Sequence, residues 1–115
     1  MFEYARVDNT KVGDHVTMLH YTDRESFTVI KKTKWTIVVQ RDQQEIDHSK
    51  WKRVFHPGGF FGHTSNDQQQ VWTVTPDPAG ATKRFWADSS GVYHAEGAKR
   101  PNVICGAHPF HDHNF

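Results

Sequence analysis

The stretch FTVIKKTKWTIVVQ (Phe27–Gln40) decides the fold. It contains two runs rich in valine, isoleucine, threonine and tryptophan, which are residue types that strands prefer. A short polar connection at Lys31–Lys34 separates the runs, so the stretch predicts a β-hairpin. No window of the chain repeats apolar residues at the 3.6-residue spacing of an amphipathic helix over the length of a helix.

Further strand candidates flank this hairpin, with turn signals at Val12–Asp14, Pro76–Gly80 and Asp88–Gly91. The candidates are HVTMLHY (His15–Tyr21), SKWKRVF (Ser49–Phe55), QQVWTVT (Gln69–Thr75), ATKRFWA (Ala81–Ala87) and VYHAE (Val92–Glu96), the last two forming a second hairpin. The polar connection Arg41–His48 is consistent with a loop or one helical turn. We expect a single all-β domain over residues 1–115: a small SH3-like barrel or sandwich of about five to eight short strands with an extended C-terminal tail.

Composition limits the size of the core and the class of partner. A chain of 115 residues makes one domain. Its hydrophobic fraction is 36% and its mean hydropathy is −0.76, so the core must be small. We expect the four tryptophans to supply much of it, because each ring buries a large area: Trp35, Trp51, Trp72 and Trp86. Fourteen Lys and Arg against 13 Asp and Glu argue against a strongly basic nucleic-acid binder, although local basic patches stay open.

The single cysteine and the N-terminus indicate the compartment. Cys105 cannot form an internal disulfide, and after Val103 and Ile104 it is expected to be a small core residue. The sequence MFEYARVDNTKVGD lacks the apolar region of a signal peptide, and no apolar run approaches the length of a membrane span. We therefore expect a soluble cytosolic protein with no membrane partner.

The segment HPGGFFGHTSN (His56–Asn66) is the first candidate site. Its glycines reach conformations closed to other residues, and successive N–H groups there can form an anion nest. Histidines flank the glycines, and the phenylalanines offer faces for a base, which would suit a phosphate joined to a base. The segment can also be a tight loop with solvated histidines, and it lacks the ending of a Walker motif. The predicted ligand-binding residues are His56, Gly58, Gly59, Phe60, Phe61, Thr64, Asn66 and, from the preceding strand, Arg53.

The C-terminal HPFHDH is the second candidate. His108, His111 and His113 with Asp112 resemble a zinc-ligand cluster, but the chain has neither a cysteine pair nor an H-E-x-x-H motif. The alternative is a tail that docks Phe110 and Phe115 on the barrel. We assign no metal and no cofactor.

Nine histidines also allow acid–base chemistry without a metal. One histidine can take a proton from a ribose 2′-hydroxyl, another can protonate the leaving oxygen, and a cation can stabilise the phosphate. The predicted catalytic residues are His63, His111, His113 and Lys52, with Arg53 or Lys34 as further cations and Tyr21 or Tyr93 assisting. The His-x-Thr pattern of two-histidine phosphoesterases occurs once, at His15–Thr17, so a different geometry would be needed. Alternatively, most of the histidines decorate a polar surface.

Basic and aromatic residues alternate in KWKRVFH (Lys50–His56) and KKTKW (Lys31–Trp35). Such a pattern can pair with phosphates and stack bases. An amphipathic strand produces the same pattern.

The chain resembles a family of small phage and prophage proteins with a PGGF-x-GH loop and an aromatic C-terminus rich in His and Asp. The resemblance covers most of the chain and rests on VGDHVTMLHYTDRESFTVI (Val12–Ile30), TIVVQRD (Thr36–Asp42), PGGFFGHTSNDQQQVW (Pro57–Trp72), TPDPAGATKRFW (Thr75–Trp86) and HPFHDHNF (His108–Phe115). It implies a phage protein that works in the bacterial host cytoplasm, and it implies no mechanism. Many phage proteins of this size counter host defence.

Three functions remain open. The first, which we favour, is a counter-defence phosphodiesterase that cleaves cyclic nucleotide immune signals by histidine acid–base chemistry. The second is a non-catalytic sponge that sequesters such a signal. The third is an SH3-like module that binds a protein or a nucleic acid. In each case exposed strand edges would allow a homodimer.

Overall fold

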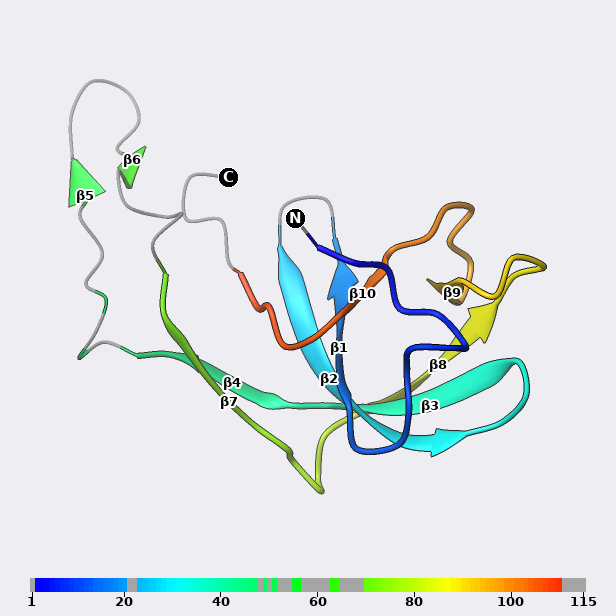
Figure 1. The fold of residues 1–115 in the computed structure, drawn as a ribbon. Helices are drawn as coiled ribbons and strands as arrows, with labels where there is room; N and C mark the ends of the chain where they lie inside the picture. Colours follow the sequence, from blue (N-terminus) through cyan, green and yellow to red (C-terminus); the bar gives the residue numbers. More distant parts are fainter. Residues whose placement is uncertain are drawn as a thin grey trace.

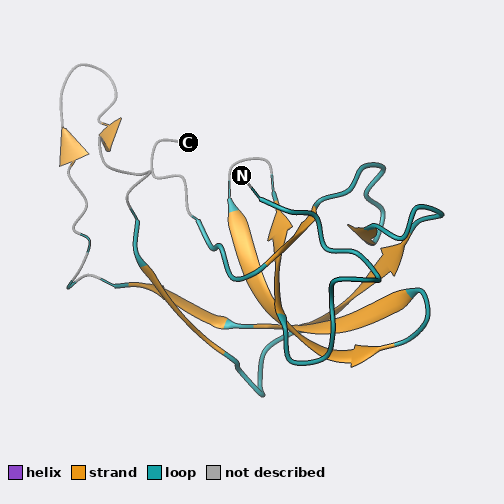
Figure 2. Cartoon of the chain, viewed as in Figure 1, coloured by secondary structure: helices purple, strands orange, loops and turns teal. Residues whose placement is uncertain are grey.

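The computed structural model describes residues 2–20, 23–47, 49, 51, 55–56, 63–64 and 70–110, with the backbone alone at 55–56 and 63–64. These residues form strands and loops and no helix (Figure 2). The strands are β1 (His15–Leu19), β2 (Arg24–Lys32), β3 (Thr36–Arg41), β4 (Gln43–Ile46), β5 (Phe55–His56), β6 (His63–Thr64), β7 (Trp72–Thr75), β8 (Thr82–Ala87), β9 (Tyr93–Ala95) and β10 (Val103–Cys105). No helix in the described ranges is long and apolar enough to cross a membrane.

Six antiparallel strands in the order β10-β1-β2-β3-β8-β9 form one sheet that curls into a nearly closed barrel (Figure 1). The N-terminal segment Glu3–Val7 lies between the two edge strands. On one side the Ala5 N–H donates to the Val103 carbonyl (2.9 Å), and on the other the Val7 N–H donates to the Gly91 carbonyl (2.8 Å). Both edges of the sheet thus find backbone partners, which protects them from pairing with other chains. The expected all-β barrel is confirmed.

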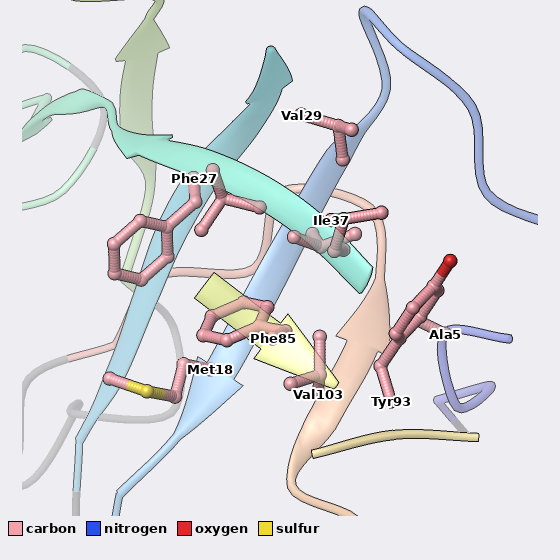
Figure 3. Packing of buried hydrophobic residues seen from close by; sticks show 10 residues of the cluster. Ala5, Met18, Phe27, Val29, Ile37, Phe85, Tyr93 and Val103 are labelled. Carbon is pink, nitrogen blue, oxygen red and sulfur yellow. The ribbon is translucent and has the colours of Figure 1, made fainter. Parts of the chain in front are cut away.

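Alternation along each strand builds the core. In β1, Val16 and Met18 point inward; in β3, Ile37 and Val39 do so. Phe27 and Phe85 meet edge to face inside the barrel, with ring centroids 5.7 Å apart (Figure 3). The cluster of buried residues is Ala5, Val16, Met18, Phe27, Val29, Ile37, Val39, Phe85, Tyr93 and Val103. Cys105, predicted to be a small core residue, is only partly buried and packs against this cluster.

The tryptophan prediction was largely wrong. Trp51 is buried, but Trp72 is half-buried, and Trp35 and Trp86 are 49% and 46% exposed. Trp86 occupies an outward position because its neighbour Phe85 points into the core. Phenylalanine, tyrosine and branched aliphatic side chains fill the barrel instead.

Both predicted hairpins are present. β2 and β3 pair across the Lys31–Lys34 connection, where the Thr33 N–H donates to the Thr36 carbonyl (2.9 Å). A register shift between Val29 and Lys31 marks a β-bulge in β2, which increases local twist and helps the sheet to curl. β8 pairs with β9 across the Asp88–Gly91 turn.

Two predictions of secondary structure fail. The Arg41–His48 connection is neither a loop nor a helical turn: it contains β4, which pairs with β7. In Figure 1 these strands leave the barrel as a two-stranded ribbon, with β5 and β6 beyond it. The candidate strand Ser49–Phe55 is wrong at Ser49, which lies in a turn; Phe55 begins β5, and the residues between them other than Trp51 lie outside the described part. β10 was missed altogether.

Candidate functional site

Most of the predicted site residues lie outside the described part of the chain: Lys52, Arg53, Gly58, Gly59, Phe60, Phe61, Asn66, His111 and His113. The same is true of Tyr21, Gly62, Ser65, Asp112 and Phe115. At His56, His63 and Thr64 the backbone is described. β5 and β6 pair antiparallel, and His56 is the direct partner of His63. The two histidines therefore sit opposite each other on neighbouring strands, and their roles stay predictions.

A basic and aromatic surface lies on the outer side of β2, β3 and β8. The register aligns Lys31, Val38 and Arg84 in one row across the three strands, and pairs Thr36 with Trp86 in the next. Trp35 directly precedes β3. We call this surface the Trp–Arg face and define it by Lys31, Lys34, Trp35, Val38, Arg84 and Trp86.

Two adjoining hollows shape the Trp–Arg face. One of about 500 Å³ is lined by Lys31, Lys34 and Trp35 together with Arg84 and Trp86. The other, about 630 Å³, shares Val38, Arg84 and Trp86 with the first and reaches past β8 to Ala95 and Glu96 and to the core residues Met18 and Phe85. Sites for small molecules commonly measure about 300–1,000 Å³. Each hollow is therefore large enough to hold a nucleotide-sized group.

The charges of this surface are unbalanced. Lys31, Lys34, Lys83 and Arg84 line the two hollows, and Glu96 is the one acidic residue among their described lining. None of the four cations forms an ion pair with any residue that the structure describes. Two of them lie over exposed indoles: Lys34 Nζ is 5.7 Å from the Trp35 ring centroid, and the Arg84 guanidinium carbon is 5.7 Å from that of Trp86. Three of the four cations, Lys31, Lys34 and Arg84, belong to the Trp–Arg face, so a chain with a net charge of +1 concentrates positive charge there.

The sequence identified part of this surface. KKTKW was a candidate for stacking and phosphate binding, and Lys34 was a candidate cation; Lys31, Lys34 and Trp35 lie here, whereas Lys32 donates hydrogen bonds to the carbonyls of Val7 and Thr10. Arg84 and Trp86 were missed because they were assigned to an ordinary hairpin strand. The available signal was the pair Arg84 and Trp86 at alternate positions, on the opposite side of β8 from Phe85.

The four histidines whose side chains are described mostly pair with carboxylates. His15 Nδ1 lies 2.9 Å from Asp42 Oδ2, His20 Nε2 lies 2.7 Å from Glu25 Oε1, and His94 Nε2 lies 2.7 Å from Asp88 Oδ2. The fourth, His108, packs its ring against Phe2 with centroids 4.7 Å apart. Histidine decoration of a polar surface is therefore not the whole explanation, since three of the four rings have defined partners.

Burial excludes Thr17, to which the sequence assigned no role, from a ligand site and overturns the assisting role predicted for Tyr93. Thr17, the threonine of the His-x-Thr match, is fully buried; its hydroxyl donates to the Gly106 carbonyl (2.7 Å) and accepts from the His108 N–H (2.9 Å). It cannot face a ligand beside His15. Tyr93 is fully buried in the core, and burial raises the pKa of its phenol, so it cannot assist acid–base chemistry at the surface. Burial also raises the pKa of the Cys105 thiol, with further contributions from Glu3 and Asp14, which fits an unreactive cysteine.

The first part of the C-terminal tail docks, as the alternative to a metal cluster predicted. Arg24 and Phe110 exchange backbone hydrogen bonds of 2.9 and 3.1 Å, and the Arg24 guanidinium carbon lies 4.9 Å from the Phe110 ring centroid. Arg24 Nε also donates to the His108 carbonyl (2.8 Å). Among the described residues no group of three metal-ligating side chains occurs.

Comparison of the chain with protein-family models, with curated proteins and with solved structures finds no match.

Proposed function

We propose that this protein binds single-stranded nucleotides through the Trp–Arg face, taking either a short linear oligonucleotide or a cyclic one. One observation carries the proposal: two half-exposed tryptophans each lie beside a cation that no described carboxylate neutralises. Unpaired bases stack on indoles, and phosphates pair with lysine and arginine. Because indoles and cations share one surface, we infer a ligand that carries both unpaired bases and phosphates.

The exposure of the indoles distinguishes this proposal from an ordinary amphipathic strand. An amphipathic strand turns its large aromatic rings toward the core, as β8 does with Phe85. Trp35 and Trp86 do the opposite, and the apolar side chain of Val38 on β3 lines the same hollow as both indoles. Base stacking contributes about 1–3 kcal/mol per base, so two indoles contribute about 2–6 kcal/mol, and the phosphate contacts of the cations must supply the rest of the roughly 8 kcal/mol that a micromolar Kd requires.

The proposal keeps the nucleotide ligand of the sequence-based hypotheses and moves its site. The phosphodiesterase hypothesis rested on His63, His111, His113 and Lys52, whose side chains are not described, and it stays a prediction. Host counter-defence, the phage setting and a homodimer likewise stay predictions. A protein partner that offers acidic side chains to the cations and apolar side chains to the indoles would use the same surface, and it is distinguished by the absence of nucleotide binding in the test below.

The test is tryptophan fluorescence titrated with a panel of ligands: cyclic mono-, di- and trinucleotides, a short single-stranded DNA, a short RNA and duplex DNA. We expect quenching by single-stranded ligands, weakened at least about tenfold by Trp86→Ala and by Arg84→Ala. Trp72→Phe is the matched control for the indole and Lys99→Ala for the charge, because neither residue lines the Trp–Arg face. The logarithm of the association constant should fall linearly with the logarithm of the salt concentration, with a slope proportional to the number of phosphates contacted.

Chromatography of the bound ligand before and after heat denaturation of the protein then distinguishes a non-catalytic binding protein from an enzyme. A ligand recovered intact indicates a sponge, and new products indicate an enzyme. No single-stranded ligand bound at low salt, or equal binding by Trp86→Ala and wild type, would refute the proposal.

A further inference from the structure

Asp42 is a buried carboxylate at the junction of β3 and β4. It accepts hydrogen bonds from Ser26 Oγ (2.6 Å), Thr28 Oγ1 (2.5 Å) and His15 Nδ1 (2.9 Å), and its side chain has no exposed surface. Because an ionised carboxylate only accepts hydrogen bonds, Nδ1 of His15 must carry a proton. In the neutral imidazole the lone pair then lies on Nε2. This arrangement orients a histidine for accepting a proton, as a carboxylate does in a catalytic triad.

The Nε2 atom of His15 is open. It makes no hydrogen bond to any part of the chain that the structure describes, and 32% of the His15 side chain is exposed. The rings of His20 and His94 differ, because their Nε2 atoms are already held by Glu25 and Asp88. Among these histidine–carboxylate pairs, His15 alone combines a fully buried carboxylate with an available Nε2.

A pocket of about 230 Å³ adjoins His15, lined also by Asn9, Thr10, Asp14, Cys105 and Gly106. It is smaller than the pockets that hold whole drug-sized ligands, so it admits part of a nucleotide, such as one sugar. The Asp14 carboxylate at its wall disfavours a phosphate inside it, so in the proposed binding the sugar enters the pocket and its phosphate stays at the mouth. An uncharged sugar hydroxyl meets no such repulsion, and can approach Nε2 as a hydrogen-bond donor.

The pocket at His15 lies beside β2, the strand that also carries Lys31 of the Trp–Arg face. His15 pairs with Thr28 across β1 and β2, and Lys31 follows three residues later on β2, where the bulge returns it to the outer side. Ile30 between them is exposed. A chain of nucleotides stacked on the face can therefore continue along β2 toward His15.

We propose that His15 is the general base of a ribonucleotide transphosphorylation, with Asp42 as its positioning residue; this rests on the proposed binding of single-stranded nucleotides. His15 Nε2 takes the proton of a ribose 2′-hydroxyl, and the 2′-oxygen forms a bond to the adjacent phosphorus. The bond from phosphorus to the 5′-oxygen of the next nucleotide breaks, and that oxygen takes a proton from water. The hydroxide so formed takes the proton from His15. The products are a 2′,3′-cyclic phosphate and a 5′-hydroxyl, with no oxidation or reduction.

The test uses one labelled oligoribonucleotide and its 2′-deoxy counterpart, with binding and cleavage measured on the same samples. Wild-type protein should bind both and cleave only the ribonucleotide. His15→Gln keeps a side-chain amide near Asp42 and should bind equally while cleaving at least about 100-fold more slowly, the lower range of a general base. His20→Gln is the matched control and should cleave as wild type does.

The positioning role of Asp42 has its own readout. In the wild type, ring-nitrogen NMR should show His15 with its neutral-form proton on Nδ1, and Asp42→Asn should change that tautomer population and the pH profile of cleavage. If Asp42→Asn fails to fold, the His15→Gln comparison still decides the proposal. Binding of both oligonucleotides without ribonucleotide cleavage, or cleavage unchanged in His15→Gln, would overturn it and leave the proposed function standing. Binding of neither oligonucleotide would overturn both.

Discussion

Replacing Asp42 with alanine should destabilise the barrel more than any exposed acidic substitution. The change leaves the fully buried Ser26 hydroxyl without its hydrogen-bond acceptor, which lowers the free energy of unfolding by about 1–3 kcal/mol. Thr28 and His15 also lose their bonds to the carboxylate, but both are partly exposed and can turn to water, so each loss costs about 0.5–1.5 kcal/mol. We expect about 2–6 kcal/mol in total, a large share of the roughly 5–15 kcal/mol that holds a small domain together.

Urea unfolding followed by circular dichroism measures this loss, with Asp8→Ala as the control. Asp8 is 81% exposed and lies 3.8 Å from Arg6, an exposed pair that contributes less than about 1 kcal/mol. The double variant with Ser26→Ala should lose less than the sum of the two single variants, because it removes the orphaned hydroxyl. A loss for Asp42→Ala no larger than that for Asp8→Ala would refute this account of the buried network.

Three further changes test other parts of the fold. Tyr93→Phe removes a buried hydroxyl for which no described residue offers a partner, so thermal unfolding should show unchanged or higher stability, by up to about 1 kcal/mol. Gly106→Ala should destabilise by at least about 1–2 kcal/mol in the same assay, because Gly106 has φ +86° and a Cβ there would lie 2.7 Å from His108 Nε2. The pKa of Asp88 is lowered chiefly by its hydrogen bond to His94, so this contribution to stability is present above the ordinary pKa of 3.8 and is lost as pH falls through the lowered value. His94→Gln should therefore flatten the loss of stability in an acid titration below that pH.

The hairpins could be predicted because their signals are local. The β-rich runs around Lys31–Lys34 and the turn residues of Asp88–Gly91 each lie within one short window, and the paired strands follow directly. β4 could not be found in this way. Its sequence QQEI is polar, and it is a strand because β7, nearly thirty residues later, supplies the backbone partners.

The sequence also could not predict which side of its strand a tryptophan occupies. Local alternation in ATKRFWA separates Phe85 from Trp86 but does not say which of the two enters the core. The register settles it: Phe85 pairs with Ile37, whose side chain is fully buried, and Trp86 pairs with the half-buried Thr36. Counting aromatic residues as core therefore placed two binding candidates inside the protein.

No short sequence motif marks the His15–Asp42 pair, because the two residues are far apart in the sequence and β2 lies between them in the sheet. His15 reaches Asp42 only since β2 pairs with β1 at Thr28 and the Asp42 N–H donates to the Ser26 carbonyl. The signal in the sequence was indirect: Ser26 and Thr28 alternate with the core residues Phe27 and Val29. Hydroxyl residues at outward positions of a strand beside an acidic residue at the end of the next strand predict a covered polar layer. A histidine on the neighbouring strand is then the residue to inspect, and here it is the one whose second nitrogen remains available.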